Sequence, residues 1–126
     1  MMNKEDYVSL EVAKLLKEKG FNWPCEYFYS KIYDRIISII GDDLSRATYE
    51  YIGKENILIP SLWDTHKCLR EEHNIIVGIT CNSTNEWYYS IIVFNSITCK
   101  TIYVSEKPYK SYEEALNNGI LKALKF

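Results

Sequence analysis

The chain from Pro60 to Phe126 decides the fold, and it reads PSLWDTHKCLREEHNIIVGITCNSTNEWYYSIIVFNSITCKTIYVSEKPYKSYEEALNNGILKALKF. Three runs within it, residues 75–81, 87–94 and 99–104, are rich in β-branched and aromatic residues, which is typical of strands. The segments 82–85 and 95–96 between them contain only Asn, Ser and Thr, which favour turns. Such short connections predict antiparallel neighbours, because a parallel return needs a long crossover.

A helix is predicted on each side of these strands. Ser61 and Asp64 have the spacing of a capping box, Leu62 and Leu69 recur at helical spacing, and Asn74 can end this helix in a left-handed conformation. The second helix starts with another capping box, Ser111-Tyr112-Glu113-Glu114. Its apolar residues fall on one broad face: Tyr112, Ala115, Leu116, Gly119, Ile120, Ala123 and Leu124.

The first half of the chain is less regular. Residues 10–19 predict an amphipathic helix, with Ser9 as N-cap and Gly20 after its last turn. The aromatic run 26–29 predicts a strand. Residues 32–44 fit a helix or a strand by periodicity, and we favour a strand because isoleucine is a modest helix former. Residues 48–52 and 57–59 are further strand candidates, and Asp42-Asp43 is a predicted turn or cap.

These patterns together predict an α+β fold in a single domain, residues 1–126. We expect an antiparallel sheet with helices packed on one face, a C-terminal half of order α-β-β-β-α, and an N-terminal helix with extra strands. The length of 126 residues is typical of one domain. A hydrophobic content of 47% argues against disorder.

The net charge and the N-terminal residues of the chain restrict the classes of function that we expect. The net charge of −2 comes from interspersed acidic and basic residues, so the basic patch of a typical nucleic-acid binder is missing. The first residues carry no apolar run of a secretory signal, and no segment has the length of a membrane span. We therefore expect a cytoplasmic protein.

The reactive residue types suggest no catalytic site. Cys25, Cys68, Cys81 and Cys99 lack the close spacing of zinc ligands, so we expect them to be reduced and mostly buried. His66 and His73 would share a helix face, but the sequence gives neither a catalytic partner. No nucleotide-binding, hydrolase or metalloprotease motif is present. We predict a chain without enzymatic activity, cofactor or metal.

Three blocks carry a family resemblance: residues 7–21, then Pro60-Ser61-Leu62 with residues 68–75, then residues 109–115. Their order and spacing resemble a family of small uncharacterised proteins of gut Bacteroides, often thought to travel on phages or other mobile elements. The resemblance is weakest over residues 32–57. It implies a bacterial, cytoplasmic, single-domain protein and supplies no activity or site residue.

Nucleic-acid binding is the alternative function. The order α-β-β-β-α is similar to the double-stranded RNA-binding fold, but Glu113 and Glu114 stand where that fold presents basic side chains to phosphate. Residues 10–16 are similar to the first helix of excisionase-type DNA binders, yet Trp23-Pro24 and a strand follow in place of a recognition helix.

The aromatic content points to an interaction surface. Eleven tyrosines and three tryptophans exceed what one small core needs, and both residue types are enriched where proteins bind each other. We expect a protein-interaction module or homodimer that uses an aromatic sheet face or its edge. The predicted partner-binding residues are Trp87, Tyr88, Tyr89 and Tyr103.

Overall fold

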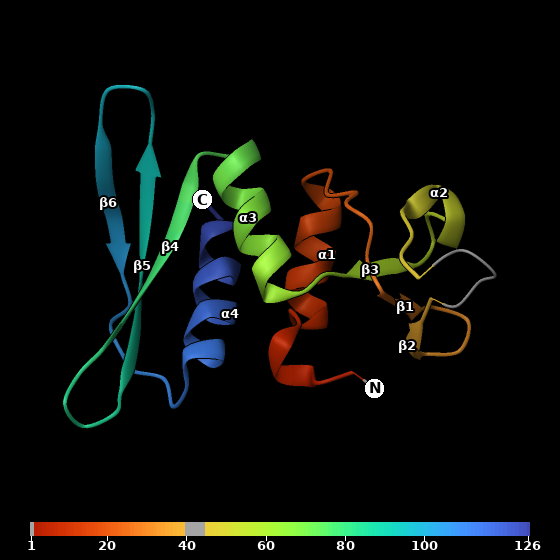
Figure 1. The fold of residues 1–126 in the computed structure, drawn as a ribbon, viewed down its shortest axis with the longest axis horizontal. Helices are drawn as coiled ribbons and strands as arrows, with labels where there is room; N and C mark the ends of the chain where they lie inside the picture. The colour runs from red at the N-terminus through yellow and green to blue at the C-terminus, as the bar shows by residue number, and fades with distance from the viewer. Residues whose placement is uncertain (1, 40–44) are drawn as a thin grey trace. The chain divides into compact units, whose positions relative to one another are not determined.

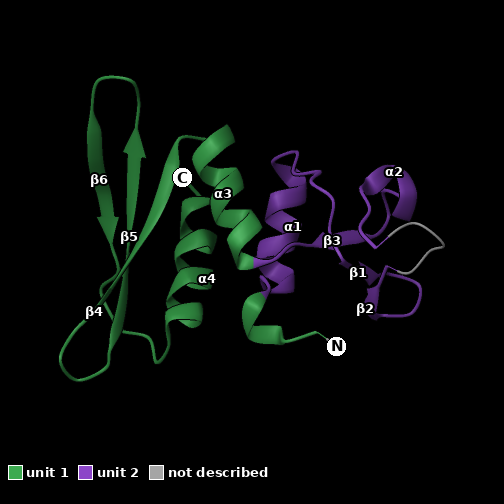
Figure 2. Ribbon diagram, viewed as in Figure 1, with its two compact units in different colours: residues 1–6, 62–126 green, residues 7–61 purple. Residues whose placement is uncertain are grey.

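The structure is a computed structural model that describes residues 2–39 and 45–126. The chain divides into two compact units (Figure 2). Unit 1 comprises Met1–Asp6 and Leu62–Phe126, and unit 2 comprises Tyr7–Ser61. Each unit holds one three-stranded antiparallel sheet with helices, so the predicted α+β class is confirmed. The single-domain prediction stays a prediction, and it requires both units to unfold in one transition.

Unit 1 has the predicted order α-β-β-β-α (Figure 1). Its elements are the short 3₁₀ helix η1 (Lys4–Asp6), helix α3 (Leu62–Glu72), strands β4 (Ile75–Cys81), β5 (Trp87–Phe94) and β6 (Cys99–Val104), and helix α4 (Tyr112–Ala123). The sheet order is β4-β5-β6, and both pairs of neighbours are antiparallel. Asn74 has a φ of 57° after α3, as expected of a left-handed helix stop.

Asparagine side chains build both turns of this sheet. The side-chain oxygen of Asn82 accepts from the backbone N–H groups of Thr84 and Glu86, both at 3.0 Å. The side-chain oxygen of Asn95 accepts from the N–H groups of Ile97 and Thr98, both at 2.8 Å. Each side chain therefore takes the place of a backbone acceptor, which is why these short polar segments reverse the chain.

Helix α4 covers one face of the sheet. Its N-cap is Ser111, whose hydroxyl accepts from the backbone N–H of Glu114 at 3.1 Å, as predicted. Gly119 faces the strands: a Cβ added there would lie 2.5 Å from Val77 Cγ1 and 3.1 Å from Tyr89 Cβ. The helix backbone thus lies directly on β4 and β5. Helices α3 and α4 lie on the same side of the sheet (Figure 1).

Unit 2 consists of helix α1 (Leu10–Glu18), strands β1 (Tyr27–Ser30) and β2 (Arg35–Ser38), the helical turn α2 (Tyr49–Ile52) and strand β3 (Ile57–Ile59). The sheet order is β2-β1-β3, and α1 packs on β3. Both predicted caps of α1 are confirmed. The Ser9 hydroxyl accepts from the N–H of Val12 at 3.3 Å, and Gly20 has a φ of +88°.

The predicted strand over residues 48–52 is wrong, because this segment forms α2. A side chain distant in sequence fixes it: Asn22 accepts from the backbone N–H of Tyr49 at 2.9 Å and donates to the Glu50 carboxylate at 3.1 Å. The buried Tyr49 hydroxyl also accepts from the N–H of Leu58 at 3.1 Å. These long-range bonds override the strand preference of tyrosine and isoleucine.

The predicted strand over residues 32–44 is confirmed only for β2. Ile32 and Tyr33 lie instead in the turn that joins β1 to β2, where the N–H of Tyr33 donates to the Ser30 hydroxyl and Asp34 has a φ of 50°. Residues 40–44, with the predicted turn or cap at Asp42-Asp43, are outside the described part of the chain.

Lys17 joins α1 to the turn before β3, and replacing it tests this link. Its ammonium donates to the carbonyls of Lys54 and Asn56 and lies 5.2 Å from the centre of the Tyr49 ring. We expect Lys17→Met to lower the free energy of unfolding by about 1–2 kcal/mol, since it removes charged hydrogen bonds and a cation–π contact. Urea titration followed by circular dichroism measures this loss. Lys14→Met, on the exposed side of the same helix, is the control, and an equal loss there would contradict the assignment.

Candidate functional site: the open face of the C-terminal sheet

The four predicted partner-binding residues lie on two opposite faces of the sheet. Side chains alternate along a strand, so Trp87 and Tyr89 point to one face of β5 and Tyr88 to the other. The Trp87 ring meets the Tyr112 ring of α4 edge-on, with the ring centres 5.8 Å apart. Tyr89 is buried under Gly119 of the same helix. The expectation of one platform made by all four residues is therefore corrected.

Tyr103 belongs to the helix-covered face with Tyr89. The two rings are stacked with their centres 6.0 Å apart, and the Lys122 ammonium of α4 lies 4.5 Å from the centre of the Tyr103 ring. Burial, and then the neighbouring Tyr109 and Tyr103, raise the pKa of Tyr89 to about 12. The ring contacts of Tyr89 and Tyr103 and the position of Lys122 show that this cluster packs α4 onto the sheet.

The opposite face of the sheet has no covering element within unit 1 among the residues that the structure describes. Strand pairing identifies the residues on it, because directly paired residues share a face. We call this surface the open face. Its members are Ile76, Gly78 and Thr80 of β4, Tyr88, Ser90, Ile92 and Phe94 of β5, and Cys99, Thr101 and Val104 of β6.

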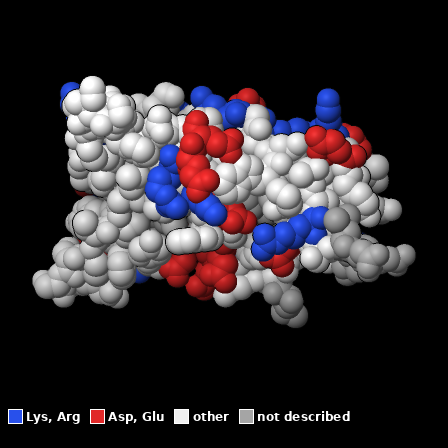
Figure 3. Space-filling model, turned by 45° about the horizontal axis from the view of Figure 1, so that its top comes forward, with Lys and Arg blue, Asp and Glu red and all other residues white. Residues whose placement is uncertain are grey.

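The composition of the open face is unusual for a surface in contact with water. An antiparallel sheet with one solvated face normally carries polar and charged residues there. None of the ten open-face residues is charged. Ile76, Tyr88, Ile92 and Phe94 are partly exposed, and Val104 is 57% exposed. In Figure 3 the visible surface at the left, where the C-terminal sheet lies, is mostly white.

The centre of the open face is a shallow depression. Gly78 has no side chain, and Ser90 beside it is so close that a Cβ added to Gly78 would lie 2.7 Å from its hydroxyl oxygen. Ile76 pairs with Ile92 in the next row of the sheet. A row of short side chains thus runs across the strands beside a row of bulky apolar ones. The depression over the short side chains can receive side chains of a partner.

The free edge at β6 is less suited to pairing with another strand. The register shifts between Ile91, paired with Tyr103, and Ile92, paired with Thr101, which leaves an extra residue at Ile102. Bulges and lysines on an edge strand, here Lys100, discourage edge-to-edge pairing. The β6 edge is therefore a less suitable binding surface than the open face.

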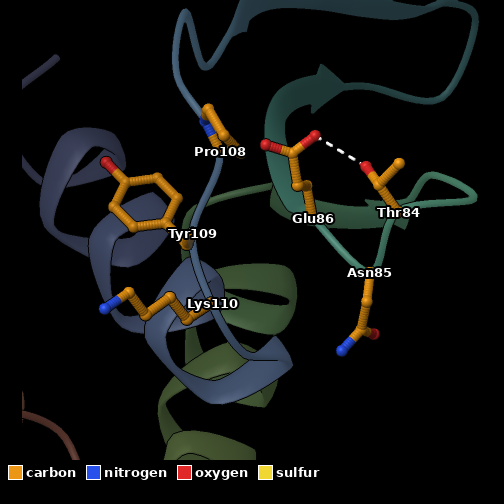
Figure 4. Close-up of a pocket in the computed structure, with 6 residues that line it drawn as sticks. All are labelled: Thr84, Asn85, Glu86, Pro108, Tyr109 and Lys110. Atoms are coloured by element: carbon orange, nitrogen blue, oxygen red, sulfur yellow. Dashed lines mark hydrogen bonds between the residues drawn. The ribbon is translucent and has the colours of Figure 1, made fainter.

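A shallow hollow of about 460 Å³ lies beside the sheet, between the β4–β5 turn and residues 108–110 (Figure 4). The Glu86 carboxylate in it accepts from the Thr84 hydroxyl at 2.8 Å and from the Asn82 amide at 3.0 Å. These bonds lower the pKa of Glu86. Tyr109 and Lys110 point away from the carboxylate in Figure 4. The polar groups do not converge, so the hollow lacks the arrangement of a catalytic site.

The cysteines divide evenly between interior and surface. Cys25 and Cys68 are buried, whereas Cys81 and Cys99 are exposed, so the expectation of mostly buried cysteines is wrong for two of the four. Burial, with Glu72 beside the thiol, raises the pKa of Cys68 to about 12, so this thiol is a poor nucleophile. Among the described residues, no cluster of three or more His, Cys, Asp or Glu side chains could hold a metal ion.

His66 is half-buried on α3, and His73 is exposed beyond the end of this helix. The Nε2 atom of His66 is buried and has no hydrogen-bond partner among the described residues. Burial, and then the nearby Arg70, lower the pKa of His66. The site in the folded protein therefore disfavours the charged form of this imidazole.

His66 should make stability depend on pH. Because its folded pKa lies below the unfolded value of about 6.5, the unfolded chain takes up the proton first as the pH falls. We expect the free energy of unfolding to decrease as the pH falls through this range, and His66→Gln to flatten the decrease. Urea titrations at about pH 7, 6 and 5 measure it. His73→Gln is the control. If His73→Gln removed the pH dependence of stability and His66→Gln left it unchanged, the assignment to His66 would be wrong.

The sequence contains a signal for the open face that composition alone does not reveal. Trp87 to Phe94 is apolar on both faces of the strand except at Ser90, and the preceding strand has its one glycine at Gly78. These two small residues are paired and lie on the less apolar side. If Ser90 is taken to face outward, the alternation along β5 places Tyr88 on its side and Trp87 and Tyr89 on the other.

No helix in the described part of the chain combines the length and the apolar character that crossing a bilayer requires. Compared with protein-family models, with curated proteins and with solved structures, the chain gives no match. The resemblances to a Bacteroides family and to the double-stranded RNA-binding fold stay predictions.

Proposed function

We propose that this chain is a non-enzymatic interaction module that binds a protein through the open face. One observation carries the proposal: the outer side of the central strand β5 bears Tyr88, Ile92 and Phe94, and none of the ten open-face residues is charged. A contiguous apolar surface of this kind usually marks a binding site. The tyrosine supplies the apolar body and polar tip that suit a contact formed and released in water.

The chemistry of the open face also defines the partner. Burying an unpaired charge costs several kcal/mol, so a neutral surface selects a partner patch that is itself neutral and apolar. Nucleic acid is a poor fit, because phosphate contacts need Lys or Arg and the open face has neither. The partner is therefore expected to be a protein surface with few charges.

Two matched lysine substitutions test the proposal. Ile92→Lys places a charge at the centre of the open face, whereas Ile97→Lys places the same charge on an 89% exposed side chain in the β5–β6 turn. Each variant and the unaltered protein serve as immobilised bait in a lysate of the cells that produce the protein. A retained protein is then purified and its affinity is measured by calorimetry.

The expected result is binding at least about tenfold weaker for Ile92→Lys and nearly unchanged for Ile97→Lys. A partner that binds all three baits equally overturns the proposal. So does the absence of any retained protein together with the absence of self-association. A mobility shift with RNA or DNA that is strong at low salt and fades as salt is added would favour the nucleic-acid alternative instead.

A further inference from the structure

We infer that the partner of the open face is a second copy of this chain, packed sheet against sheet across a twofold axis. The inference rests on the proposed function and names its partner. Two features of the face support it, its charge and its relief, and its size sets the expected strength of the dimer.

Charge is the first feature. In a twofold dimer residue i of one copy meets residue j of the other and j meets i, so a charge close to the axis lies near its own copy. Like charges brought together at an interface cost several kcal/mol. The open face carries no Asp, Glu, Lys or Arg at any of its ten positions, whereas these four residue types make up 25% of the chain. This face can therefore meet its own copy without repulsion.

Relief is the second feature. One row across the three strands consists of Gly78, Ser90 and Val104, and its two small residues are on β4 and β5. The next row consists of Ile76, Ile92 and Thr101. A twofold axis that runs across the strands between these rows sets the Ile76–Ile92 ridge of each copy over the Gly78–Ser90 depression of the other. Two sheets of the same twist pack in this way at about −30° and about 10 Å apart.

The size of the face sets the expected strength of the dimer. The three strands have 7, 8 and 6 residues. With a strand spacing of about 4.8 Å and a rise of about 3.3 Å per residue, they offer a footprint of roughly 350 Å² per copy. A standard interface buries about 800 Å² per partner. The dimer is thus in the weak, transient class, and its assembly has to be followed from about 10 µM to about 1 mM.

Two exposed native thiols allow the face to be probed directly. Cys99 pairs with Phe94 and lies on the open face, whereas Cys81 pairs with Trp87 and points to the opposite side. The rate of alkylation of each thiol is measured by mass spectrometry across the concentration range. We expect Cys99 to react several-fold more slowly at the highest concentration and Cys81 to react at a constant rate.

Sedimentation equilibrium on the same samples gives the mass. Dimer formation is expected for the unaltered protein and for Ile97→Lys, and its loss for Ile92→Lys. If circular dichroism shows that Ile92→Lys is unfolded, Val104→Lys takes its place, since Val104 is 57% exposed. A dimer that survives the open-face substitution overturns the inference, and so does equal protection of both thiols.

A monomer at every concentration also overturns the inference, but it leaves the proposed function standing. In that case a different protein occupies the open face, and the bait experiment identifies it by its loss on Ile92→Lys. The two failures are therefore distinguishable.

Discussion

Replacing Ile91 by alanine is expected to lower the free energy of unfolding by about 3 kcal/mol, within the range of about 2–5 kcal/mol for a fully buried aliphatic side chain. Ile91 is 0% exposed and lies on the face of β5 that α4 covers. Ile92, the next residue, is the matched control. It is partly exposed on the open face, so Ile92→Ala should cost about 1 kcal/mol, clearly less than Ile91→Ala.

The comparison is made by urea titration at about 1 µM protein, below the range in which the proposed dimer assembles. At this concentration any stabilisation of Ile92 by a second copy is absent. Equal losses for the two variants would mean that both faces are buried within one chain, and the open face would then not exist. A loss for Ile92→Ala that appears only at high concentration would instead support the dimer.

The C-terminal half could be predicted because its signals are local. The asparagine turns, the Ser111 cap and the two-residue alternation of β4 and β5 each depend on residues within a few positions of one another. Residues 48–52 could not be predicted, because Asn22 is 27 residues from the N–H of Tyr49 that it binds. Tertiary contacts of this kind override local propensity.

The sequence predicts the kind of surface that forms the candidate site, but not which residues lie on it. The sequence indicated an apolar, aromatic sheet surface, and Tyr88 lies on it. Alternation along β5 separates Tyr88 from its neighbours Trp87 and Tyr89, but residue type does not tell which of the two sets faces outward. That choice depends on where α4 packs, and α4 packs where Gly119 lets its backbone approach Val77 and Tyr89.

Replacing Gly119 by valine is expected to lower the free energy of unfolding by about 2–4 kcal/mol. The β-branched side chain must occupy space already taken by Val77 Cγ1, 2.5 Å from the position of an added Cβ, and by Tyr89 Cβ, at 3.1 Å. Asn118→Val is the matched control for valine in this helix, because Asn118 is only partly buried. We expect Asn118→Val to cost about 1 kcal/mol or less.

A double-mutant cycle shows whether the loss comes from this contact. Gly119→Ala gains about 1 kcal/mol of helix propensity, but its methyl group collides with Val77, so we expect a net loss of about 1 kcal/mol. Val77→Ala alone should cost about 2 kcal/mol, because Val77 is only 2% exposed. In the double variant the alanine methyl group of α4 occupies the space that Val77 leaves. We therefore expect the double variant to be more stable than the sum of the single losses predicts, by at least about 1 kcal/mol. Additive losses would mean that α4 does not approach β4 at Gly119, and the assignment of covered and open faces would then have to be reversed or abandoned.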